Sequence, residues 1–370
     1  MPSSEDSRLP CVSVSFAQPI APERRELARA AFGGSIAQVW SEQHDRLHLL
    51  FANGADAARF STENLAALGH FETNRNDLPS RGALVQPIFV IAAPRSGSTL
   101  LFELLAAADE AWTVGDESHR VIEGVPALAT DRRGFESDRL TAADATPQNV
   151  AALHAAFLPE LRASDDTRWL DLAPADRPRQ MRLVEKTPKN SLRVSFLLAA
   201  FPDARIVFLY RAPAENLGSI VEAWRSGWFV SRPSLPGWSG APWSLLLPPG
   251  WRALDGRPLE EIAAYQWQAA NRAALDDLEA CDAERLCVVD YHELVADPRA
   301  TLERLCRFAG VTFGERLRAL TSAPLQVSRS AVTPPDPAKW RRLAPAVEAL
   351  LPSLAETHER LRAKRRASAG

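Results

Sequence analysis

Pro87–Ala92 (PIFVIA) and the adjoining Ala93–Thr99 (APRSGST) give the clearest structural signal in the chain. The first segment is a short continuous apolar run, which is typical of a strand buried on both faces of a parallel sheet. The second segment is rich in small residues, and it leads into a helix pattern that runs to about Ala107. The order of strand, tight turn and helix predicts the beginning of an α/β unit.

Further strand patterns follow along the chain and alternate with helix patterns. The strands are expected at Leu183–Lys186, Arg205–Tyr210 and Leu286–Tyr291, and helices near Ser191–Phe201 and Pro213–Trp224. This alternation predicts an α/β fold in which a central parallel sheet with right-handed crossovers carries helices on both faces.

The first 80 or so residues follow a looser pattern. Short strands are expected at Cys11–Phe16 and Arg46–Phe51, and helices near Pro22–Ala31 and Ala55–Leu68. We therefore expect a small α+β extension over residues 1–82, packed on an α/β domain that spans residues 83–370.

Composition excludes several classes of protein. The chain has 370 residues, 46% apolar and 24% charged, which excludes global disorder. With 43 Lys and Arg against 46 Asp and Glu, the net charge of −3 excludes a globally basic nucleic-acid binder. No apolar run reaches the roughly 18–20 residues that cross a bilayer, and the first ten residues lack a secretory signal pattern. We expect a cytoplasmic protein that acts without nucleic acid or membrane.

The four cysteines predict neither disulfides nor a metal site. They form no CxxC pair, and the histidines do not cluster with them at ligand spacing. We expect reduced, chemically inert thiols and no bound metal.

The turn Arg95–Thr99 has the properties of a phosphate cradle. Between a buried strand and a helix N-terminus, backbone N–H groups and the helix dipole stabilise an anion. Gly97 allows close backbone approach, Ser98 and Thr99 offer hydroxyls, and Arg95 adds a fixed charge. The Walker A pattern GxxxxGK[ST] is absent. A tight turn of small residues without a ligand is the alternative.

A second anion site is predicted one strand further along the chain. Arg211 follows the strand Arg205–Tyr210 directly, and Ser219 lies eight residues later in the next helix pattern. Open α/β sheets bind ligands at the carboxyl ends of their strands, so the two side chains are placed to hold a second phosphate. An arginine capped by a neighbouring carboxylate is the alternative.

The two motifs together, PRSGSTLL at 94–101 and YRxPxxNxxS at 210–219, resemble the sulfotransferases that use 3′-phosphoadenylyl sulfate (PAPS). The chain is most similar to the broad bacterial group that also resembles tyrosylprotein sulfotransferases. The resemblance covers residues 86–224, extends weakly to about residue 340, and leaves the first 80 or so residues outside. It implies a three-layer, P-loop-like fold.

The resemblance also implies roles for the residues of both motifs. The 5′-phosphosulfate would be bound by Arg95, Ser96, Gly97, Ser98 and Thr99, and the 3′-phosphate by Arg211 and Ser219. The product would be adenosine 3′,5′-bisphosphate (PAP).

Lys186 ends the strand Leu183–Lys186 in the segment EKTPKN. Members of the resembled family carry a lysine at the same place, and Lys186 would neutralise the bridging oxygen of the leaving nucleotide. A surface lysine paired with Glu185 is the alternative.

The acceptor needs a base, because an alcohol or phenol loses its proton as it attacks sulfur. The segment GDESHRVI at 115–122 resembles the GEETRVI-like stretch of tyrosylprotein sulfotransferases, in which the glutamate is the base. The resemblance makes Glu117 the general base. His119 stands where that family has an arginine, unless Arg120 is that arginine shifted by one, so His119 is an alternative base. For Glu117, a first-turn helix acid favoured by the dipole is the alternative.

Two basic residues near the C-terminus extend the resemblance. In related sulfotransferases a late basic loop folds over the nucleotide, often with a Lys-Trp pair, and here Lys339 is followed by Trp340. Arg329 and Lys339 are therefore expected near the 3′-phosphate or the adenine. An ordinary surface loop before a C-terminal helix is the alternative.

The sequence thus predicts sulfuryl transfer from PAPS to a hydroxyl of a small-molecule or carrier-bound biosynthetic intermediate. Transfer to nitrogen, the acceptor's identity and the oligomeric state stay open. The segment 227–256 holds four tryptophans, and it is expected to be a lid or substrate-binding loop, with structural packing as the alternative. A P-loop kinase or nucleotide hydrolase and a non-catalytic nucleotide-binding module are the competing functions.

Overall fold

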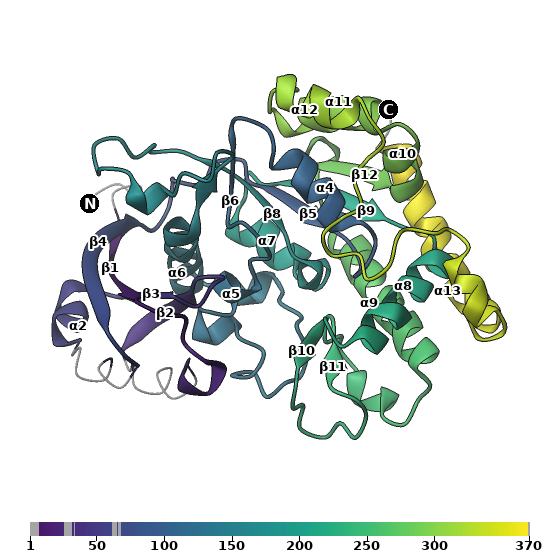
Figure 1. Ribbon diagram of the computed structural model, residues 1–370, viewed down its shortest axis with the longest axis horizontal. Coiled ribbons are helices and arrows are strands. Elements are labelled where there is room, and N and C mark those ends of the chain that lie inside the picture. The colour runs from purple at the N-terminus through teal and green to yellow at the C-terminus, as the bar shows by residue number, and fades with distance from the viewer. Residues whose placement is uncertain (1–6, 26–31, 33, 61–64, 66–67, 369–370) are drawn as a thin grey trace. The chain divides into compact units, whose positions relative to one another are not determined.

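The computed structural model describes residues 7–25, 32, 34–60, 65 and 68–368 (Figure 1). They fold into two compact units that interleave along the chain. Unit 1 consists of Met1–Val85, Trp112–Arg133 and Asp144–Leu183, and unit 2 of Gln86–Ala111, Gly134–Ala143 and Val184–Gly370. The expected domain boundary at residue 82 stays a prediction.

Unit 1 contains a four-stranded antiparallel sheet in the order β2-β3-β1-β4. Its strands are β1 (Arg8–Phe16), β2 (Ser35–Trp40), β3 (Arg46–Phe51) and β4 (Phe71–Pro79). The strands expected at 11–16 and 46–51 are confirmed, and they pair with each other through partners such as Val12 and Leu49. Alternate apolar side chains of these strands are buried together in a core of their own, as period-2 patterning requires.

The helices expected in the first 80 residues are seen only in part. Helix α2 (Gly54–Arg59) begins after Asn53, whose side chain accepts a hydrogen bond from the Asp56 N–H. Residues 26–31, 61–64 and 66–67 of the expected helices lie outside the described residues. The other elements of unit 1 include β6 (Ala111–Thr113, whose first residue belongs to unit 2), α5 (His119–Ile122), η1 (Pro126–Leu128), α6 (Pro147–Phe157), η3 (Leu158–Glu160), β7 (Arg162–Ala163) and η4 (Trp169–Asp171).

Unit 2 is built on parallel strands in the order β12-β9-β5-β8, which confirms the expected α/β fold. These strands are β12 (Leu286–Asp290), β9 (Arg205–Tyr210), β5 (Ile88–Ile91) and β8 (Arg182–Lys186). The division between the units falls within β8, after Leu183.

Helices cover both faces of this parallel sheet. On one face, Ile88 and Val90 share a core with α4 (Ser98–Leu105) and α11 (Pro298–Ala309). The opposite face carries Phe89, whose ring lies 5.3 Å from that of Phe201 at the end of α7 (Val194–Ala200). Successive strand side chains point to opposite faces, so both sides of β5 are buried against helices.

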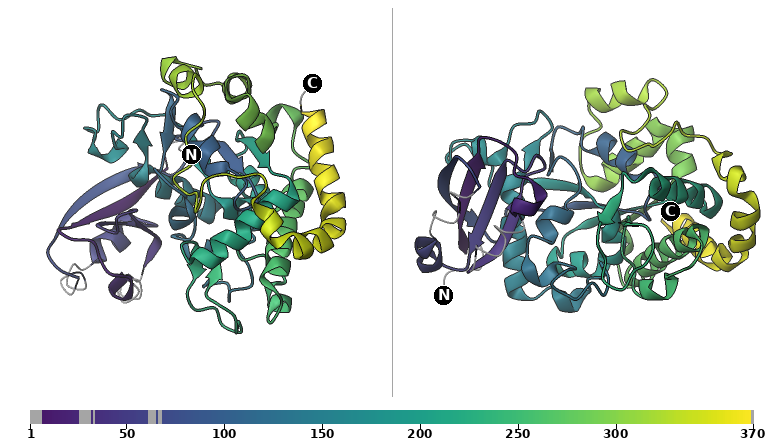
Figure 2. Two further views of the ribbon diagram at one scale, coloured as in Figure 1. Left: turned by 45° about the vertical axis from the view of Figure 1, so that its right-hand side comes forward. Right: turned by 60° about the horizontal axis from the view of Figure 1, so that its bottom comes forward.

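The remaining elements of unit 2 follow the chain order. The long C-terminal helix α13 packs against α8 and α9 (Figure 2). These elements are η2 (Ala142–Asp144, shared with unit 1), η5 (Pro188–Leu192), α8 (Pro213–Ser226), β10 (Val230–Arg232), β11 (Trp243–Ser244), η6 (Trp251–Leu254), α9 (Leu259–Asp277), η7 (Ala283–Arg285), α10 (Tyr291–Ala296), α12 (Glu315–Thr321), η8 (Lys339–Leu343) and α13 (Ala344–Ala367).

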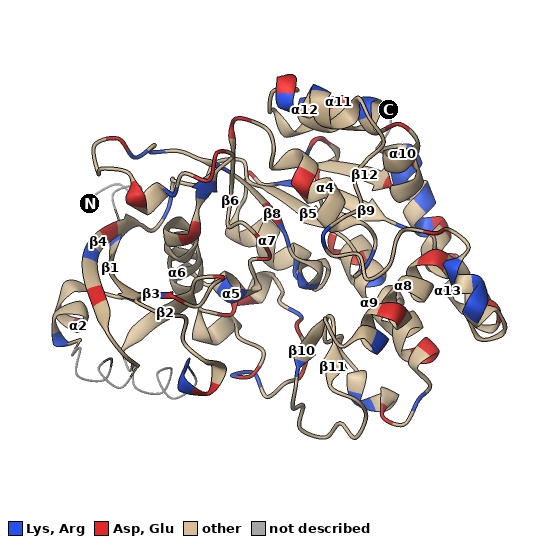
Figure 3. Ribbon diagram, in the orientation of Figure 1, with Lys and Arg blue, Asp and Glu red and all other residues tan. Residues whose placement is uncertain are grey.

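Surface charge and thiol chemistry agree with the composition. Lys and Arg are interspersed with Asp and Glu along the ribbon (Figure 3). The four cysteines are free, and burial raises the pKa of Cys11 to about 12 and that of Cys306 to about 11. Burial also raises the pKa values of Cys281 and Cys287. The described part of the chain contains no helix with the length and apolar character to cross a membrane.

Candidate functional site

Three predicted cations lie at the carboxyl ends of three adjacent parallel strands in unit 2. Strand β5 pairs with β8 on one side and with β9 on the other. Arg95 is in the turn after β5, Lys186 is the last residue of β8, and Arg211 directly follows β9. Because parallel strands end at the same edge of a sheet, the fold brings these residues to one edge, where open α/β sheets bind ligands.

The turn after β5 has an unusual backbone. Arg95 has φ of +65° and Gly97 has φ of +95°, which are left-handed conformations. A β-carbon on Gly97 would lie 2.5 Å from the ring of Tyr291, so only glycine fits there. Arg95 holds a conformation that L-residues adopt rarely, and such strain is often found at functional sites.

Buried hydrogen bonds hold this turn in place. The Ser96 hydroxyl donates to Oδ1 of Asn216 at 2.7 Å, and Nδ2 of Asn216 donates to the Pro94 carbonyl at 2.7 Å. Ser96 and Asn216 are both completely buried. Asn216 lies on α8, so this helix fixes the turn that precedes α4.

Sequence reasoning did not assign a role to Asn216. Its only signal is its place in the pattern YRxPxxNxxS, between Arg211 and Ser219. The structure also shows that the proton of the Ser96 hydroxyl is used inside the protein. The phosphosulfate contacts expected of Ser96, Ser98 and Thr99 stay predictions.

Lys186 is buried, with 2% of its surface exposed. This excludes the alternative of a surface lysine. Glu185 is also buried, and it accepts hydrogen bonds from the Thr187 hydroxyl at 2.6 Å and from Nδ2 of Asn190 at 2.8 Å. As the last residue of β8, Lys186 lies at the strand ends, where open α/β sheets bind ligands.

Arg211 is ion-paired within the protein. Its Nη2 lies 3.0 Å from Oε2 of Glu215, and Oε1 of Glu215 lies 3.1 Å from Nε2 of His292. The Arg211 guanidinium also lies over the ring of Tyr291, 4.5 Å from its centroid. The alternative of a carboxylate-capped arginine is therefore present in the structure. Ser219 lies one turn beyond Glu215 on α8 and is half-buried.

The late basic residues contact the two helices that flank the strand ends. Nε of Arg329 lies 3.1 Å from Oε1 of Glu103 on α4, and Nζ of Lys339 lies 2.9 Å from Oε2 of Glu222 on α8. Trp340 packs so closely on α8 that a β-carbon at Gly218 would lie 2.9 Å from it. The loop thus joins α4 to α8, while the nucleotide contacts expected of Arg329 and Lys339 stay predictions.

Glu117 and His119 belong to unit 1, unlike the other predicted site residues. Nδ1 of His119 lies 3.7 Å from Oε2 of Glu117, and both side chains are partly exposed. They flank Ser118 at the beginning of α5. The roles expected of Glu117 and His119 as bases stay predictions.

Arg120 anchors α5 in the interior of unit 1. Its Nη1 donates to the Trp40 carbonyl at 2.6 Å and to Oε2 of Glu160 at 3.3 Å. Burial raises the pKa of Glu160, but its hydrogen bond to His48 and the charges of His48 and Arg120 outweigh burial and leave that pKa below its ordinary value. Arg120 therefore has a structural role in holding the helix that carries His119.

Three of the four tryptophans in the segment 227–256 pack against one another. Trp243 and Trp251 are completely buried, and their ring centroids are 5.8 Å apart. The ring of Trp238 lies 4.9 Å from that of Trp243. Trp228 is the exception, with 69% of its surface exposed. Packing accounts for three of the four tryptophans, and only Trp228 presents most of its ring to solvent.

Arg95, Lys186 and Arg211 place three cationic side chains at this edge, and the turn that carries Arg95 leads into the N-terminus of α4. Cationic side chains and helix N-termini are suited to phosphate or sulfate groups. Across the residues that the structure describes, no group of three or more His, Cys, Asp and Glu side chains is arranged to hold a metal ion.

The chain is similar, at low sequence identity, to several solved structures of sulfotransferases. STF9 from Mycobacterium avium is 21% identical with a TM-score of 0.41, covering 74% of this chain and 76% of that one. The sulfotransferase domain of the curacin biosynthetic pathway is 16% identical with a TM-score of 0.39, covering 72% and 99%. Mouse sulfotransferase SULT7A1, solved in complex with PAP, is 12% identical with a TM-score of 0.37, covering 77% and 89%.

The family assignment rests on the sequence. No curated protein is similar enough to this chain to count as a match. In contrast, the sequence profile of the sulfotransferase family matches residues 87–315, a segment that contains the turn after β5, Lys186, and both Arg211 and Ser219. Because this match covers more than half of the chain, the protein belongs to the sulfotransferase family.

Proposed function

We propose that this sulfotransferase takes its sulfuryl group from PAPS and releases PAP. The observation that carries the proposal is the placement of Arg95, Lys186 and Arg211 at the ends of the adjacent strands β5, β8 and β9. PAPS has anionic groups at both ends of its ribose. Arg95 and its turn would bind the 5′-phosphosulfate, while Arg211 and Ser219 would bind the 3′-phosphate.

The reaction would be an in-line transfer of the sulfuryl group. Negative charge develops on the departing phosphate oxygen as the S–O bond breaks, and fixed donors that meet this charge lower the barrier. Lys186, Arg95 and the N–H groups of the turn would supply those donors. Glu117 would take the proton of the attacking acceptor, with His119 as the alternative base.

The acceptor would be a small molecule or a carrier-bound biosynthetic intermediate that presents a hydroxyl group, or a nitrogen in its place. The exposed ring of Trp228 supports an acceptor with apolar character. Trp228 directly precedes Phe229, whose ring contacts Arg95, so an apolar surface adjoins the residue assigned to the reacting group.

Calorimetry with PAP, AMP and ATP tests the nucleotide assignment. We expect PAP to bind at least tenfold more tightly than AMP or ATP, because only PAP carries a 3′-phosphate. Replacement of Arg211 by Ala should weaken the binding of PAP by about 2–3 kcal/mol, which is the range of a charge-assisted hydrogen bond. The affinity for AMP should not change.

Arg225→Ala is the matched control for this experiment. Arg225 lies near the C-terminus of α8, and the change breaks its 3.1 Å ion pair with Glu260 of α9. This variant should bind PAP as the unmodified protein does. Equal affinity for all three nucleotides would contradict the 3′-phosphate assignment, and turnover of magnesium-ATP without sulfuryl transfer would favour a kinase or hydrolase.

A further inference from the structure

Arg95 lies against an aromatic ring from a distant part of the sequence. Its guanidinium carbon is 4.4 Å from the ring centroid of Phe229, and both side chains are half-buried. A guanidinium over an aromatic face is attracted by the ring quadrupole, and partial removal from water strengthens the attraction. The ring therefore restricts where the Arg95 side chain lies.

The backbone of Phe229 is itself fixed. Phe229 directly precedes strand β10 of the β10–β11 hairpin, and its carbonyl accepts a hydrogen bond from the Leu245 N–H at 2.9 Å. The Ser231 hydroxyl donates to the Leu245 carbonyl at 2.5 Å. Both sides of the hairpin are thus joined next to Phe229, so the ring is presented from a rigid support.

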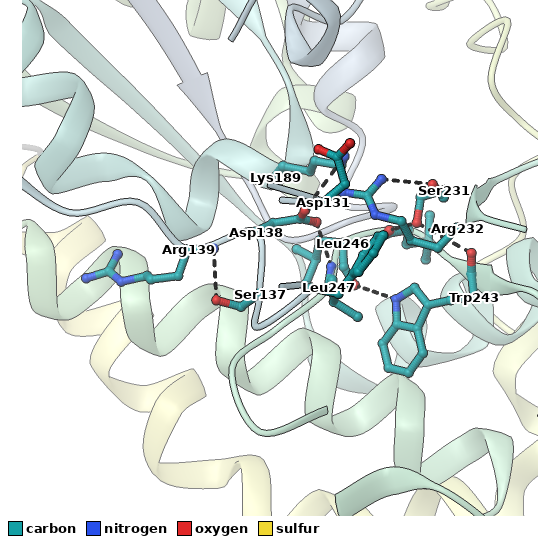
Figure 4. Close-up of polar contacts among 12 residues, drawn as sticks. Asp131, Ser137, Asp138, Arg139, Lys189, Ser231, Arg232, Trp243, Leu246 and Leu247 are labelled. Carbon is teal, nitrogen blue, oxygen red and sulfur yellow. Dashed lines mark hydrogen bonds and ion pairs between the residues drawn. The ribbon is translucent and has the colours of Figure 1, made fainter. Parts of the chain in front are cut away.

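One buried carboxylate anchors this hairpin to the unit (Figure 4). Asp138 is 1% exposed, and its Oδ1 accepts from Nη2 of Arg232, the last residue of β10, at 2.9 Å. Its Oδ2 accepts from the Leu247 N–H, just after β11, at 2.7 Å. The Asp138 N–H donates to the Leu247 carbonyl at 2.8 Å, and Nζ of Lys189 lies 3.8 Å from Oδ1. Asp138 therefore binds both arms of the hairpin that carries Phe229.

We propose that Phe229 is a positioning residue for the donor nucleotide. Its ring, held by the hairpin that Asp138 anchors, keeps the Arg95 guanidinium in place for the 5′-phosphosulfate. This inference rests on the proposed function, which assigns Arg95 to that group. With the ring present, the Arg95 side chain is already restricted before the anion binds. Without the ring, Arg95 keeps its charge, but its side chain loses conformational entropy on binding the anion, and the affinity falls.

The test compares two nucleotides that differ only at the 5′ end. The affinities for PAP and for adenosine 3′-monophosphate are measured by calorimetry. Phe229→Leu and Phe229→Met should each lower the affinity for PAP about fivefold, which corresponds to the usual strength of a cation–π contact. Neither variant should change the affinity for adenosine 3′-monophosphate. Phe229→Tyr, which restores a ring, should bind PAP as the unmodified protein does.

Two controls separate positioning from a structural role. In an Arg95→Met background, Phe229→Leu should cause no further loss of PAP affinity, because the ring acts only through Arg95. Phe313→Leu removes another Phe–Arg contact, 5.8 Å from the Arg318 guanidinium, and should leave PAP affinity unchanged.

Each outcome has a defined meaning. Equal weakening of both nucleotides by Phe229→Leu and Phe229→Met, or an undiminished PAP affinity in both, would overturn the inference and leave the proposed function standing. If the unmodified protein binds PAP no better than AMP, the proposed function fails, and the inference fails with it.

Discussion

Arg211, which is proposed to bind the 3′-phosphate, is already held by contacts within the protein. Its Nε and Nη2 both contact Oε2 of Glu215, at 3.1 and 3.0 Å, and its plane rests on Tyr291. A guanidinium has five donors in a rigid fork, so Glu215 occupies one edge and fixes the direction of the others. A phosphate at Arg211 would also face the negative charge of Glu215, so under the proposed function the affinity for a 3′-phosphate would depend on both residues.

The identity of the base is tested at Glu117 and His119. With an acceptor that supports turnover, Glu117→Gln should lower kcat by about 10²- to 10⁴-fold, the usual contribution of a general base. PAP affinity should not change, because the base contacts the acceptor. His119→Ala, the comparison variant, should reduce kcat less; a larger loss in His119→Ala than in Glu117→Gln would assign the base to His119.

At the level of helices and strands, the α8 region was predictable and the hairpin was not. Pro213 begins α8 as the sequence suggests, because its fixed φ suits a first helical turn. The role of Asn216 depends on a buried pair of hydrogen bonds with residues about 120 positions away, which spacing along the chain does not reveal.

The Trp-rich segment shows a second limit of sequence reasoning. Tryptophans indicate burial or binding equally well, because a large ring serves both. The choice between them depends on whether the rings meet one another, as Trp238, Trp243 and Trp251 do. For the same reason, the sequence did not predict the role of Asp138. It is an acidic residue in a loop, and its partners Arg232 and Leu247 become its neighbours only in the folded chain.

Asp138→Asn tests the hairpin anchor. The change removes the buried carboxylate that pairs with the half-buried Arg232 guanidinium, and breaking a buried pair typically costs about 3–5 kcal/mol. We expect a loss of that order in the free energy of unfolding, measured by urea titration. Glu136→Gln removes an exposed pair with Arg252 in the same segment and should cost less than about 1 kcal/mol. Equal effects of the two variants would show that Asp138 does not anchor the hairpin.

Across the whole molecule, the sequence indicated the α/β sheet of unit 2 more clearly than the segments that surround the sheet of unit 1. The strands of unit 2 were visible as apolar runs, since both of their faces are buried. The four-stranded sheet of unit 1 is completed by later segments: the Gln38 N–H donates to the Gly124 carbonyl at 2.8 Å, and β2 packs against α6. Such contacts between distant segments leave no periodic signal in the sequence.

The buried network of Glu160 predicts how the stability of unit 1 depends on pH. The carboxylate has no exposed surface, and it contacts Nε2 of His48 at 3.3 Å and Nη1 of Arg120 at 3.3 Å. Because the folded-state pKa lies below the ordinary value of 4.5, ionised Glu160 stabilises the fold above pH 4.5, and this stabilisation is lost as the pH falls through the folded-state pKa. Thermal unfolding is measured between pH 7 and pH 3. At pH 7, the unfolding temperature of Glu160→Gln should be lower than that of the unmodified protein, and this difference should become smaller below pH 4.5.

Glu72→Gln, at an exposed position on β4 of the same unit, is the control and should show no such difference in unfolding temperature. A difference for Glu160→Gln that stays constant with pH would mean that the side chain stabilises unit 1 by packing and not by its charge.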